Sequence, residues 1–371
     1  MLQLTSTITE NATIEIGLRD IEVPKPDADE VLIEVQASPI NPSDLGTLVG
    51  AGDLTSIRVE GEGDQAKVIM DIPESVMWAM KPRIGKPLPV GNEGSGIVTE
   101  AGQNAKHLIG KVVSAVGGGM YAQYRVLPAM ACIEMPDDIE PKDCASSFVN
   151  PLTALGMVET MKSEGHSALI HTAAASNLGQ MLVKICLADN IPLINIVRKP
   201  EQVDLLKSLG AQYVCNSSDE NFKVLLVDAI KATNATLAFD ATGGGELSGR
   251  ILSCMEIALR ANMKEFSPYG STQHKQVYIY GALNQSGISL PNNRSFGMYW
   301  GIGGWLLTPF LENAGMEKNI ELRQRVSSEI KTTFASSYTK EISLAQALSL
   351  DEMMVYGSIA TGKKYLINPS L

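Results

Sequence analysis

A turn of small residues between an apolar run and an amphipathic stretch carries the first recognisable chemistry in this sequence. The stretch is ALIHTAAASNLGQML, residues 168–182. A phosphate-binding turn of the form G-x-G-x-x-G needs a tight strand-to-helix turn, close backbone approach to a pyrophosphate, and close helix–strand packing. Its glycine positions fall here on Ala174, Ser176 and Gly179. Ala174 and Ser176 are small enough to allow a tight turn and a close approach of the backbone to the pyrophosphate, approximately as glycine would. Gly179 allows the close packing of helix against strand.

The residues that open the following helix indicate how a phosphate group would be held. Ser176 adds a hydroxyl donor that glycine lacks, and Asn177, Leu178 and Gly179 begin the helix whose N–H groups would face the phosphates. Turns of small residues also occur between strands and helices that bind nothing. The turn by itself therefore leaves cofactor binding open.

The end of the next strand indicates which dinucleotide is bound. An acid normally stands about 20 residues after the last glycine, where it binds the ribose 2′-hydroxyl of NAD. This sequence has Arg198 and Lys199 there, in NIVRKPEQ. Two cations suit a 2′-phosphate and predict NADPH. The alternative is a strand end that merely exposes two basic side chains.

Two later strand ends add backbone to the same predicted edge. FDATGGG (239–245) and YGAL (280–283) each end an apolar run. Ligands bind beyond the carboxyl ends of the strands in open parallel sheets. The candidate cofactor-binding residues from these two turns are therefore Thr242, Gly243, Gly281 and Ala282.

The elements that must position these residues alternate regularly from about residue 151. Strand-like and helix-like segments follow one another, which predicts a parallel, doubly wound α/β sheet. An amphipathic helix at about 318–334, a further helix and a closing strand are expected after it. In order, the alternating segments are ALIHTA, GQMLVKICLAD, LINIVRK, EQVDLLKSLG, QYVCN, FKVLLVDAIKATN, TLAFDATGGG, ELSGRILSCMEIALRA and QVYIYGAL; the closing ones are LAQALSLDEMMV and KKYLIN.

The first 150 residues indicate short strands and turns instead. EVLIEVQASPI (30–40) and GSGIVTEAG (94–102) are β-branched runs bounded by Pro and Gly, and residues 108–128 are typical of a hairpin-rich segment. Residues 53–89 break this rhythm with charge clusters and prolines. We therefore expect a long loop or lid there.

Composition limits the class of protein. The chain has 371 residues, which suits two domains, and a net charge of −11, which disfavours nucleic acid and anionic membranes as partners. Five cysteines without a Cys-x-x-Cys pair, and an N-terminus without a secretory pattern, predict a cytoplasmic protein. The longest apolar run, FGMYWGIGGWLLTPF (296–310), is shorter than the roughly 20 residues of a membrane span, and we interpret it as buried core.

Several motifs in a fixed order resemble the medium-chain dehydrogenase/reductase superfamily. This superfamily joins a mostly β, GroES-like twisted-barrel catalytic domain to a Rossmann domain. Quinone oxidoreductases and mitochondrial-type 2-enoyl thioester reductases are the most similar branches. Besides the turn described above, the motifs are INPSD (40–44), GNEGSGIVTEAG (91–102), YAQYRVLP (121–128), VNPLTAL (149–155), LKSLGAQYV (206–214) and ATGKKYLINP (360–369).

The resemblance implies a domain plan and further cofactor contacts. The catalytic domain would comprise residues 1–150 and 308–371, and the Rossmann domain residues 151–307. Relatives are commonly homodimers. The nicotinamide end would be held by VNPLTA, through Asn150 and Thr153, and by Lys363 of the terminal GK motif. Lys363 could equally be a solvated lysine at a strand edge.

The resemblance also bears on metal and proton chemistry. The segments that hold the catalytic zinc in zinc-dependent relatives offer Asn41, Asn92 and Asn150 here, and neutral amides are poor zinc ligands. We therefore expect no metal, and hydride delivery to an electron-poor C=C or a quinone. Asn41 is the candidate catalytic residue, as a donor to the developing oxyanion; its alternative is a side chain that caps the NPSD turn.

The expected proton donor is missing. The tyrosine that these branches place after INPSD falls here on Gly52. A proton must then come from solvent or from another segment. The candidates that the sequence offers elsewhere are Tyr121, Tyr269, His274 and Tyr299.

Two insertions make the substrate difficult to infer. They are residues 53–89 and 263–275, and the first contains Trp78 between Met77 and Met80. This apolar cluster would cap the substrate cleft or lie in a subunit interface.

The resulting expectation is a zinc-independent, NADPH-dependent reductase of a quinone or an activated C=C, acting on a small electrophile. The alternatives are a 2-enoyl thioester reductase and a cofactor-binding protein with little catalysis.

Overall fold

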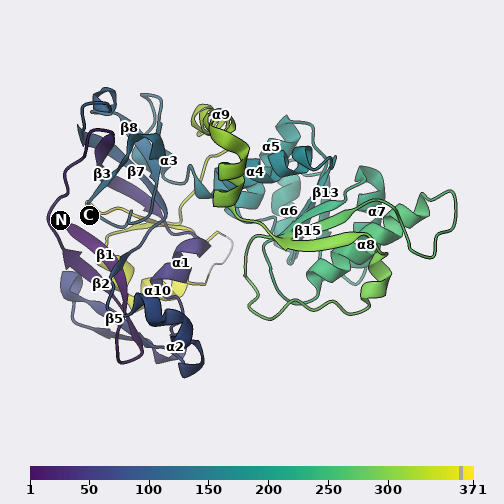
Figure 1. Ribbon diagram of the computed structural model, residues 1–371, viewed down its shortest axis with the longest axis horizontal. Helices are drawn as coiled ribbons and strands as arrows, with labels where there is room; N and C mark the ends of the chain where they lie inside the picture. The colour runs from purple at the N-terminus through teal and green to yellow at the C-terminus, as the bar shows by residue number, and fades with distance from the viewer. Residues whose placement is uncertain (359–361) are drawn as a thin grey trace. The chain divides into compact units, whose positions relative to one another are not determined.

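The computed structural model describes residues 1–358 and 362–371 (Figure 1). The chain forms two compact units. Unit 1 comprises residues 1–149 and 323–371, and unit 2 comprises residues 150–322. The expected division after residue 150 differs from this by one residue, whereas the return to the first unit is at Arg323 and not at 308.

Unit 2 contains a six-stranded parallel sheet in the order β13-β12-β11-β14-β15-β16. Numbered within the sheet this is 3-2-1-4-5-6, the order of a doubly wound dinucleotide-binding fold, so the predicted fold class is confirmed. The strands are β11 (Leu169–His171), β12 (Leu193–Val197), β13 (Tyr213–Asn216), β14 (Leu237–Asp240), β15 (Lys275–Ile279) and β16 (Trp300–Gly304); the helices are α4 (Val149–Ser163), α5 (Asn177–Ala188), α6 (Pro200–Ser208), α7 (Phe222–Thr233), α8 (Leu247–Ala261) and α9 (Leu307–Ser328).

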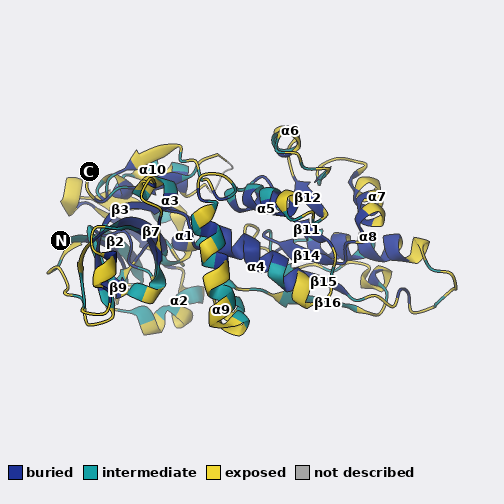
Figure 2. Cartoon of the chain, turned by 90° about the horizontal axis from the view of Figure 1, so that it is seen from above, coloured by how far each residue is buried: buried dark blue, intermediate teal, exposed yellow. Residues whose placement is uncertain are grey.

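Apolar side chains on alternate strand positions hold helices on both faces of this sheet. Ile170 and Ile194 belong to a buried cluster that includes Phe222 of α7 and Met255 of α8. Figure 2 shows α4 and α5 on the other side of the sheet, with α4 buried along almost its whole length. Helix α9 is interrupted at Gly315, whose φ of 81° is not helical.

The interpretation of residues 296–310 as buried core is wrong. Strand β16 is the last in the sheet order, and Met298, Tyr299 and Leu306 are 74%, 55% and 65% exposed. Phe296 is the exception, because it is buried and packs edge-on against Trp300 with ring centroids 5.3 Å apart. The glycines of WGIGGW have no side chains to bury, so this apolar run makes an edge strand.

Unit 1 is built from two sheets, one in the order β4-β5-β2-β1-β6 and one in the order β10-β8-β7-β3-β18-β17, with β9 paired to β3. It is the predicted mostly β unit. Its strands are β1 (Leu2–Ile8), β2 (Thr13–Asp20), β3 (Glu30–Pro39), β4 (Arg58–Glu60), β5 (Lys67–Asp71), β6 (Leu88–Pro89), β7 (Glu93–Ala101), β8 (Val112–Val116), β9 (Tyr124–Pro128), β10 (Cys132–Glu134), β17 (Lys340–Ile342) and β18 (Tyr365–Ile367); its helices are α1 (Pro42–Leu48), α2 (Glu74–Met80), α3 (Pro141–Cys144) and α10 (Leu350–Tyr356).

The segment 53–89, expected as a long loop or lid, contributes strands β4, β5 and β6 to the first sheet and contains helix α2. Strand β5 pairs antiparallel with β2 over five residue pairs, from Thr13↔Asp71 to Gly17↔Lys67. Val68 and Met70 of β5 are fully buried. The sequence conceals this strand because it has only five residues and charged ends.

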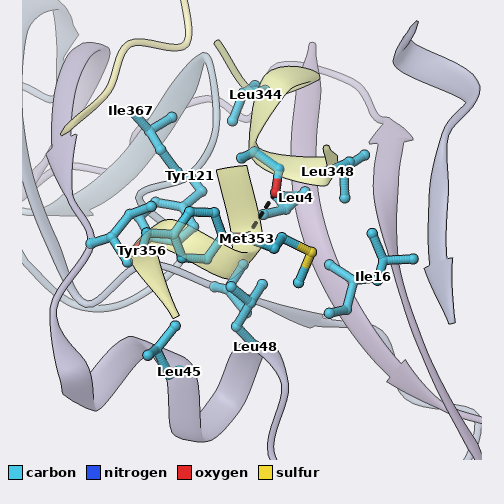
Figure 3. Packing of buried hydrophobic residues seen from close by; sticks show 14 of the residues in the cluster. Leu4, Ile16, Leu45, Leu48, Tyr121, Leu344, Leu348, Met353, Tyr356 and Ile367 are labelled. Carbon is cyan, nitrogen blue, oxygen red and sulfur yellow. Dashed lines mark hydrogen bonds between the residues drawn. The ribbon is translucent and has the colours of Figure 1, made fainter. Parts of the chain in front are cut away.

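The apolar cluster on α2 is divided between core and surface. Met77 and Met80 pack against the core of unit 1, whereas Trp78 is 74% exposed. Figure 3 shows that core, in which Tyr356 of α10 lies among leucines from several elements.

The expected hairpin within 108–128 is also absent, because β8 pairs with β7 and β10 while β9 pairs with β3.

We predict that Met70→Ala lowers the free energy of unfolding by about 2–4 kcal/mol, because it opens a cavity beneath β5. Val59→Ala, on the exposed neighbouring strand, is the control and should change stability by less than about 0.5 kcal/mol. Denaturant unfolding measures both. Equal, small effects would mean that β5 is peripheral after all.

Candidate functional sites

The turn after β11 is held by the residues that the sequence singles out. Ser176 is the N-cap of α5, and its Oγ accepts a hydrogen bond from the Gly179 N–H at 3.1 Å. The Ser176 hydroxyl proton remains able to donate to an anion. A Cβ on Gly179 would lie 2.2 Å from the Ala174 carbonyl oxygen, so only glycine allows this helix–strand contact. Ala173 adopts φ 50°, a strained value for alanine.

A buried carboxylate joins this turn to the one after β14. Asp240 accepts hydrogen bonds from the Thr172 hydroxyl at 2.8 Å, the Thr242 N–H at 2.8 Å and the Ser248 hydroxyl at 2.7 Å. Strands β11 and β14 are the pair between which the sheet order reverses. This role of Asp240 was not expected from the sequence, although the residue ends an apolar run.

The turns after β14 and β15 touch each other. A Cβ on Gly243, whose φ is 71°, would lie 2.1 Å from the Gly281 carbonyl oxygen. Gly281 and Ala282 also line a cleft of about 490 Å³. The structure therefore brings together these candidates from the two turns. The remaining lining residues of the cleft are Ile279, Tyr280, Gly304, Trp305, Leu306 and Pro309.

The two predicted cations follow β12 directly and are exposed. Arg198 is held through its backbone, because its N–H donates to Gln202 Oε1 at 3.1 Å and its carbonyl accepts from the Ser218 hydroxyl at 3.0 Å. Lys199 Nζ lies 4.0 Å from Glu201. The backbone is thus fixed while the Arg198 side chain reaches solvent.

The other expected cofactor contacts lie on separate elements. Thr153 is buried within α4, near its start, and Asn150 is partly exposed in the first turn. Lys363 is exposed in unit 1. Its neighbour Lys364 is the lysine of the GKK stretch that points into the unit.

Unit 1 contains a buried polar network centred on Glu93. The Glu93 carboxylate accepts hydrogen bonds from Asn41 Nδ2 at 2.8 Å and from the N–H groups of Phe148 and Val149 at 2.8 and 2.9 Å. Burial raises the pKa of Glu93, while the nearby Lys364 ammonium and these donors oppose the rise. Every one of these bonds favours the ionised carboxylate.

Asp44 forms a second centre of the network. It accepts from the Asn41 N–H and the Asn92 N–H, both at 2.7 Å, so it joins the two motifs INPSD and GNEG. Burial raises the pKa of Asp44 to about 7, with the nearby Glu93 contributing, although the backbone donors lower it. Asp44, and not the Asn41 side chain, completes the cap of α1.

Asn41 is fully buried, and its amide is directed at Glu93. Within residues 1–358 and 362–371, its Oδ1 has no hydrogen-bond partner. Asn92, the neighbouring amide of the GNEG motif, donates through Nδ2 to Ser43 Oγ at 3.0 Å.

A hydrogen-bonded chain extends from Lys364. Lys364 Nζ donates to Ser146 Oγ at 2.7 Å, and Ser146 Oγ shares a hydrogen bond with Tyr338 Oη at 2.9 Å. Burial lowers the pKa of Lys364 to about 8, against the attraction of Glu93 and Asp44. Burial raises the pKa of Tyr338, so this phenol is protonated at neutral pH. No short motif links these three residues, which explains why the sequence analysis missed them.

The structure explains the glycine at the position of the family tyrosine. A Cβ on Gly52 would lie 3.0 Å from side-chain atoms of Ile14 and Met70, so the strands β2 and β5 leave little room for a side chain. Of the other expected donors, Tyr121 is fully buried and donates to the Pro39 carbonyl at 3.1 Å.

The remaining sequence candidates for a proton donor belong to unit 2. Tyr269 is 70% exposed, and the His274 ring packs at a tilt of 53° against Tyr299, with ring centroids 4.7 Å apart.

In the part of the chain that the structure describes, no group of three or more His, Cys, Asp or Glu side chains is arranged to hold a metal ion. None of the helices in residues 1–358 and 362–371 combines the length and apolarity that a bilayer span requires.

Comparison with known proteins agrees with this architecture. The alcohol dehydrogenase GroES-like domain family matches residues 27–137. The mitochondrial enoyl-[acyl-carrier-protein] reductase of Xenopus tropicalis is 24% identical over 285 residues, which is 74% of this chain and 68% of the relative. Mammalian proteins of the same name are 27–28% identical, and the chain spans about half of their length.

Solved structures match over the full chain. A protein from Mesorhizobium loti assigned as a putative NADPH:quinone reductase has a TM-score of 0.72 and 26% identity, covering 100% of this chain and 98% of its own. The Escherichia coli quinone oxidoreductase, solved in complex with NADPH, has a TM-score of 0.69 at 18% identity, covering both chains fully.

The fold is that of the medium-chain dehydrogenase/reductase enzymes, and the chain is similar to quinone oxidoreductases and enoyl reductases of this class.

We predict that Glu93→Gln lowers the free energy of unfolding by about 1–3 kcal/mol. Glutamine offers one acceptor oxygen where three N–H donors now share two, so a buried donor loses its partner. Glu60→Gln, on an exposed strand, is the matched control. Thermal or denaturant unfolding of both variants gives the difference, and equal stabilities would contradict the role of Glu93.

Proposed function

We propose that this protein is an NADPH-dependent reductase that delivers hydride to a quinone or an activated C=C without zinc. The observation that carries the proposal is the pair of exposed cations, Arg198 and Lys199, at the end of β12, beside a strand order that defines a dinucleotide edge. The NADPH complex of the E. coli relative supports it. Bound NADPH supplies the hydride.

The residues on the sheet edge fit this cofactor. The N–H groups of Asn177 and Leu178, with the Ser176 hydroxyl, would hold the pyrophosphate where Gly179 allows close approach. Arg198 and Lys199 would hold the 2′-phosphate. Along the same edge, Thr242, Gly243, Gly281 and Ala282 would line the cofactor, and Asn150, Thr153 and Lys363 would serve its nicotinamide end.

The amides that replace zinc ligands have other tasks. Asn41 donates to Glu93 and Asn92 donates to Ser43, and neither amide carries the charge that zinc ligands supply. Asn41 would bind the substrate carbonyl and stabilise negative charge on its oxygen as hydride arrives. Glu93 would fix the orientation of that amide.

The chain from Tyr338 to Lys364 is suited to supply the proton. In reduction of an enone, hydride adds to the β-carbon and leaves an enolate, whose α-carbon must take a proton. Tyr338 would donate this proton, Ser146 would pass one to the phenolate, and the Lys364 ammonium would restore it before solvent reprotonates Lys364. Quinone reduction needs no such donor, because oxygen atoms exchange protons rapidly with water.

A 2-enoyl thioester reductase is the second candidate, favoured by the enoyl-[acyl-carrier-protein] reductases among the relatives. A cofactor-binding protein with little catalysis is the third. NADPH consumption measured across quinones, enones and enoyl thioesters separates the three. We also propose a homodimer, because β16 leaves an open sheet edge beside exposed apolar side chains.

We predict that Arg198→Ala weakens NADPH binding by about 2 kcal/mol, roughly 30-fold, and leaves NADH binding within about twofold. The lost guanidinium would pair with the 2′-phosphate, which NADH lacks. Isothermal titration calorimetry measures both affinities without turnover. Lys207→Ala, an exposed lysine on α6, is the control. Equal weakening of both cofactors would refute the assignment.

We predict that Tyr338→Phe slows enone reduction by roughly 100-fold while quinone reduction stays within about twofold, because only carbon protonation needs the phenol. Stopped-flow oxidation of NADPH measures both reactions. Tyr269→Phe, an exposed tyrosine, is the control. If the Tyr338→Phe variant reduced enones as fast as the wild-type protein, Tyr338 would not be the proton donor.

A further inference from the structure

A second hollow in unit 2 lies at the amino ends of the strands, away from the turns discussed above. Its volume is about 230 Å³. Its lining includes Val183 and Leu187 of α5, Leu193 and Asn195 of β12, and Tyr213 of β13. None of the described residues that line it carries a charge, which favours a neutral occupant.

Asn195 is a polar side chain in the middle of a buried strand, only 1% exposed. Its Nδ2 donates to the carbonyl oxygens of Tyr213 at 3.2 Å and Leu193 at 3.4 Å. Its Oδ1 has no hydrogen-bond partner among residues 1–358 and 362–371. A buried acceptor without a partner is unfavourable, so a donor that enters the hollow gains this interaction without breaking another.

His171 on β11 is the strand neighbour of Asn195. His171 and Asn195 are direct partners in the parallel pairing of β11 and β12, so their side chains project from the same face of the sheet. His171 Nε2 shares a hydrogen bond with Tyr280 Oη at 2.7 Å, while its Nδ1 has no partner in the described chain. Burial lowers the pKa of His171 to about 3, so the ring is neutral.

We propose that this hollow binds a small neutral molecule with an aromatic or aliphatic body and a hydroxyl group, and that the hydroxyl donates to Asn195 Oδ1. A dry cavity of about 150 Å³ holds benzene in another protein, so 230 Å³ has room for a substituted ring. The site is separate from the cofactor edge and does not depend on the proposed reductase activity.

Phenol is the probe, and toluene, which lacks the hydroxyl, is its matched control. Saturation-transfer NMR titration of the full chain should give a millimolar dissociation constant for phenol and weaker binding for toluene. Asn195→Leu, which keeps the volume and removes the acceptor, should weaken phenol at least tenfold and leave toluene unchanged. Gln212→Ala, at the exposed rim, should change neither.

A second variant tests the location independently of Asn195. Leu187 is 43% exposed at the hollow, and Leu187→Trp should block phenol while thermal unfolding reports an intact fold. The proposal is overturned if phenol does not bind the wild-type protein, if phenol and toluene bind equally, or if either Asn195→Leu or Leu187→Trp binds phenol as the wild-type protein does.

Discussion

The hydrogen bonds to the buried Glu93 carboxylate are the constraint on which unit 1 depends most. They join three distant parts of the chain: the INPSD turn through Asn41, the start of β7 through Glu93 itself, and the segment that leads into α4 through Phe148 and Val149. A buried carboxylate is costly to desolvate, so these N–H donors must stay in place. The geometry of the candidate substrate site follows from that requirement, because it orients the Asn41 amide.

Asp240 performs an equivalent task in unit 2. It takes hydroxyl and N–H donors from the turns after β11 and β14 and from α8. These turns flank the point where the strand order reverses, so one carboxylate fixes the walls of the dinucleotide edge. In both units, hydrogen bonds to a buried carboxylate thus fix the conformation of turns. These turns lack the regular backbone hydrogen bonds of helices and sheets.

Charge and proton chemistry in unit 1 are set by burial. The network contains Asp44, Glu93 and Lys364: Glu93 helps to raise the pKa of Asp44, Lys364 opposes the rise in the pKa of Glu93, and both acids oppose the fall in the pKa of Lys364. Strand β5 determines how much space is left for a side chain at position 52. It packs beside Gly52 and leaves little space for a tyrosine there, while Tyr338 and Ser146 meet Lys364 elsewhere. The same strand that extends the first sheet therefore fills the space beside Gly52.

The sequence by itself determined the parallel sheet, the turn ending at Gly179 and the two cations after β12, because periodicity, turn chemistry and offset along the chain are local properties. It also indicated the mostly β unit and the resemblance to the medium-chain dehydrogenase/reductase superfamily. Only the tertiary structure decided that residues 67–71 join the first sheet, because the partner of β5 is β2, some 50 residues earlier. The network of Glu93, Lys364 and Tyr338 was hidden for the same reason: its members are up to 271 residues apart, and only folding brings their side chains together.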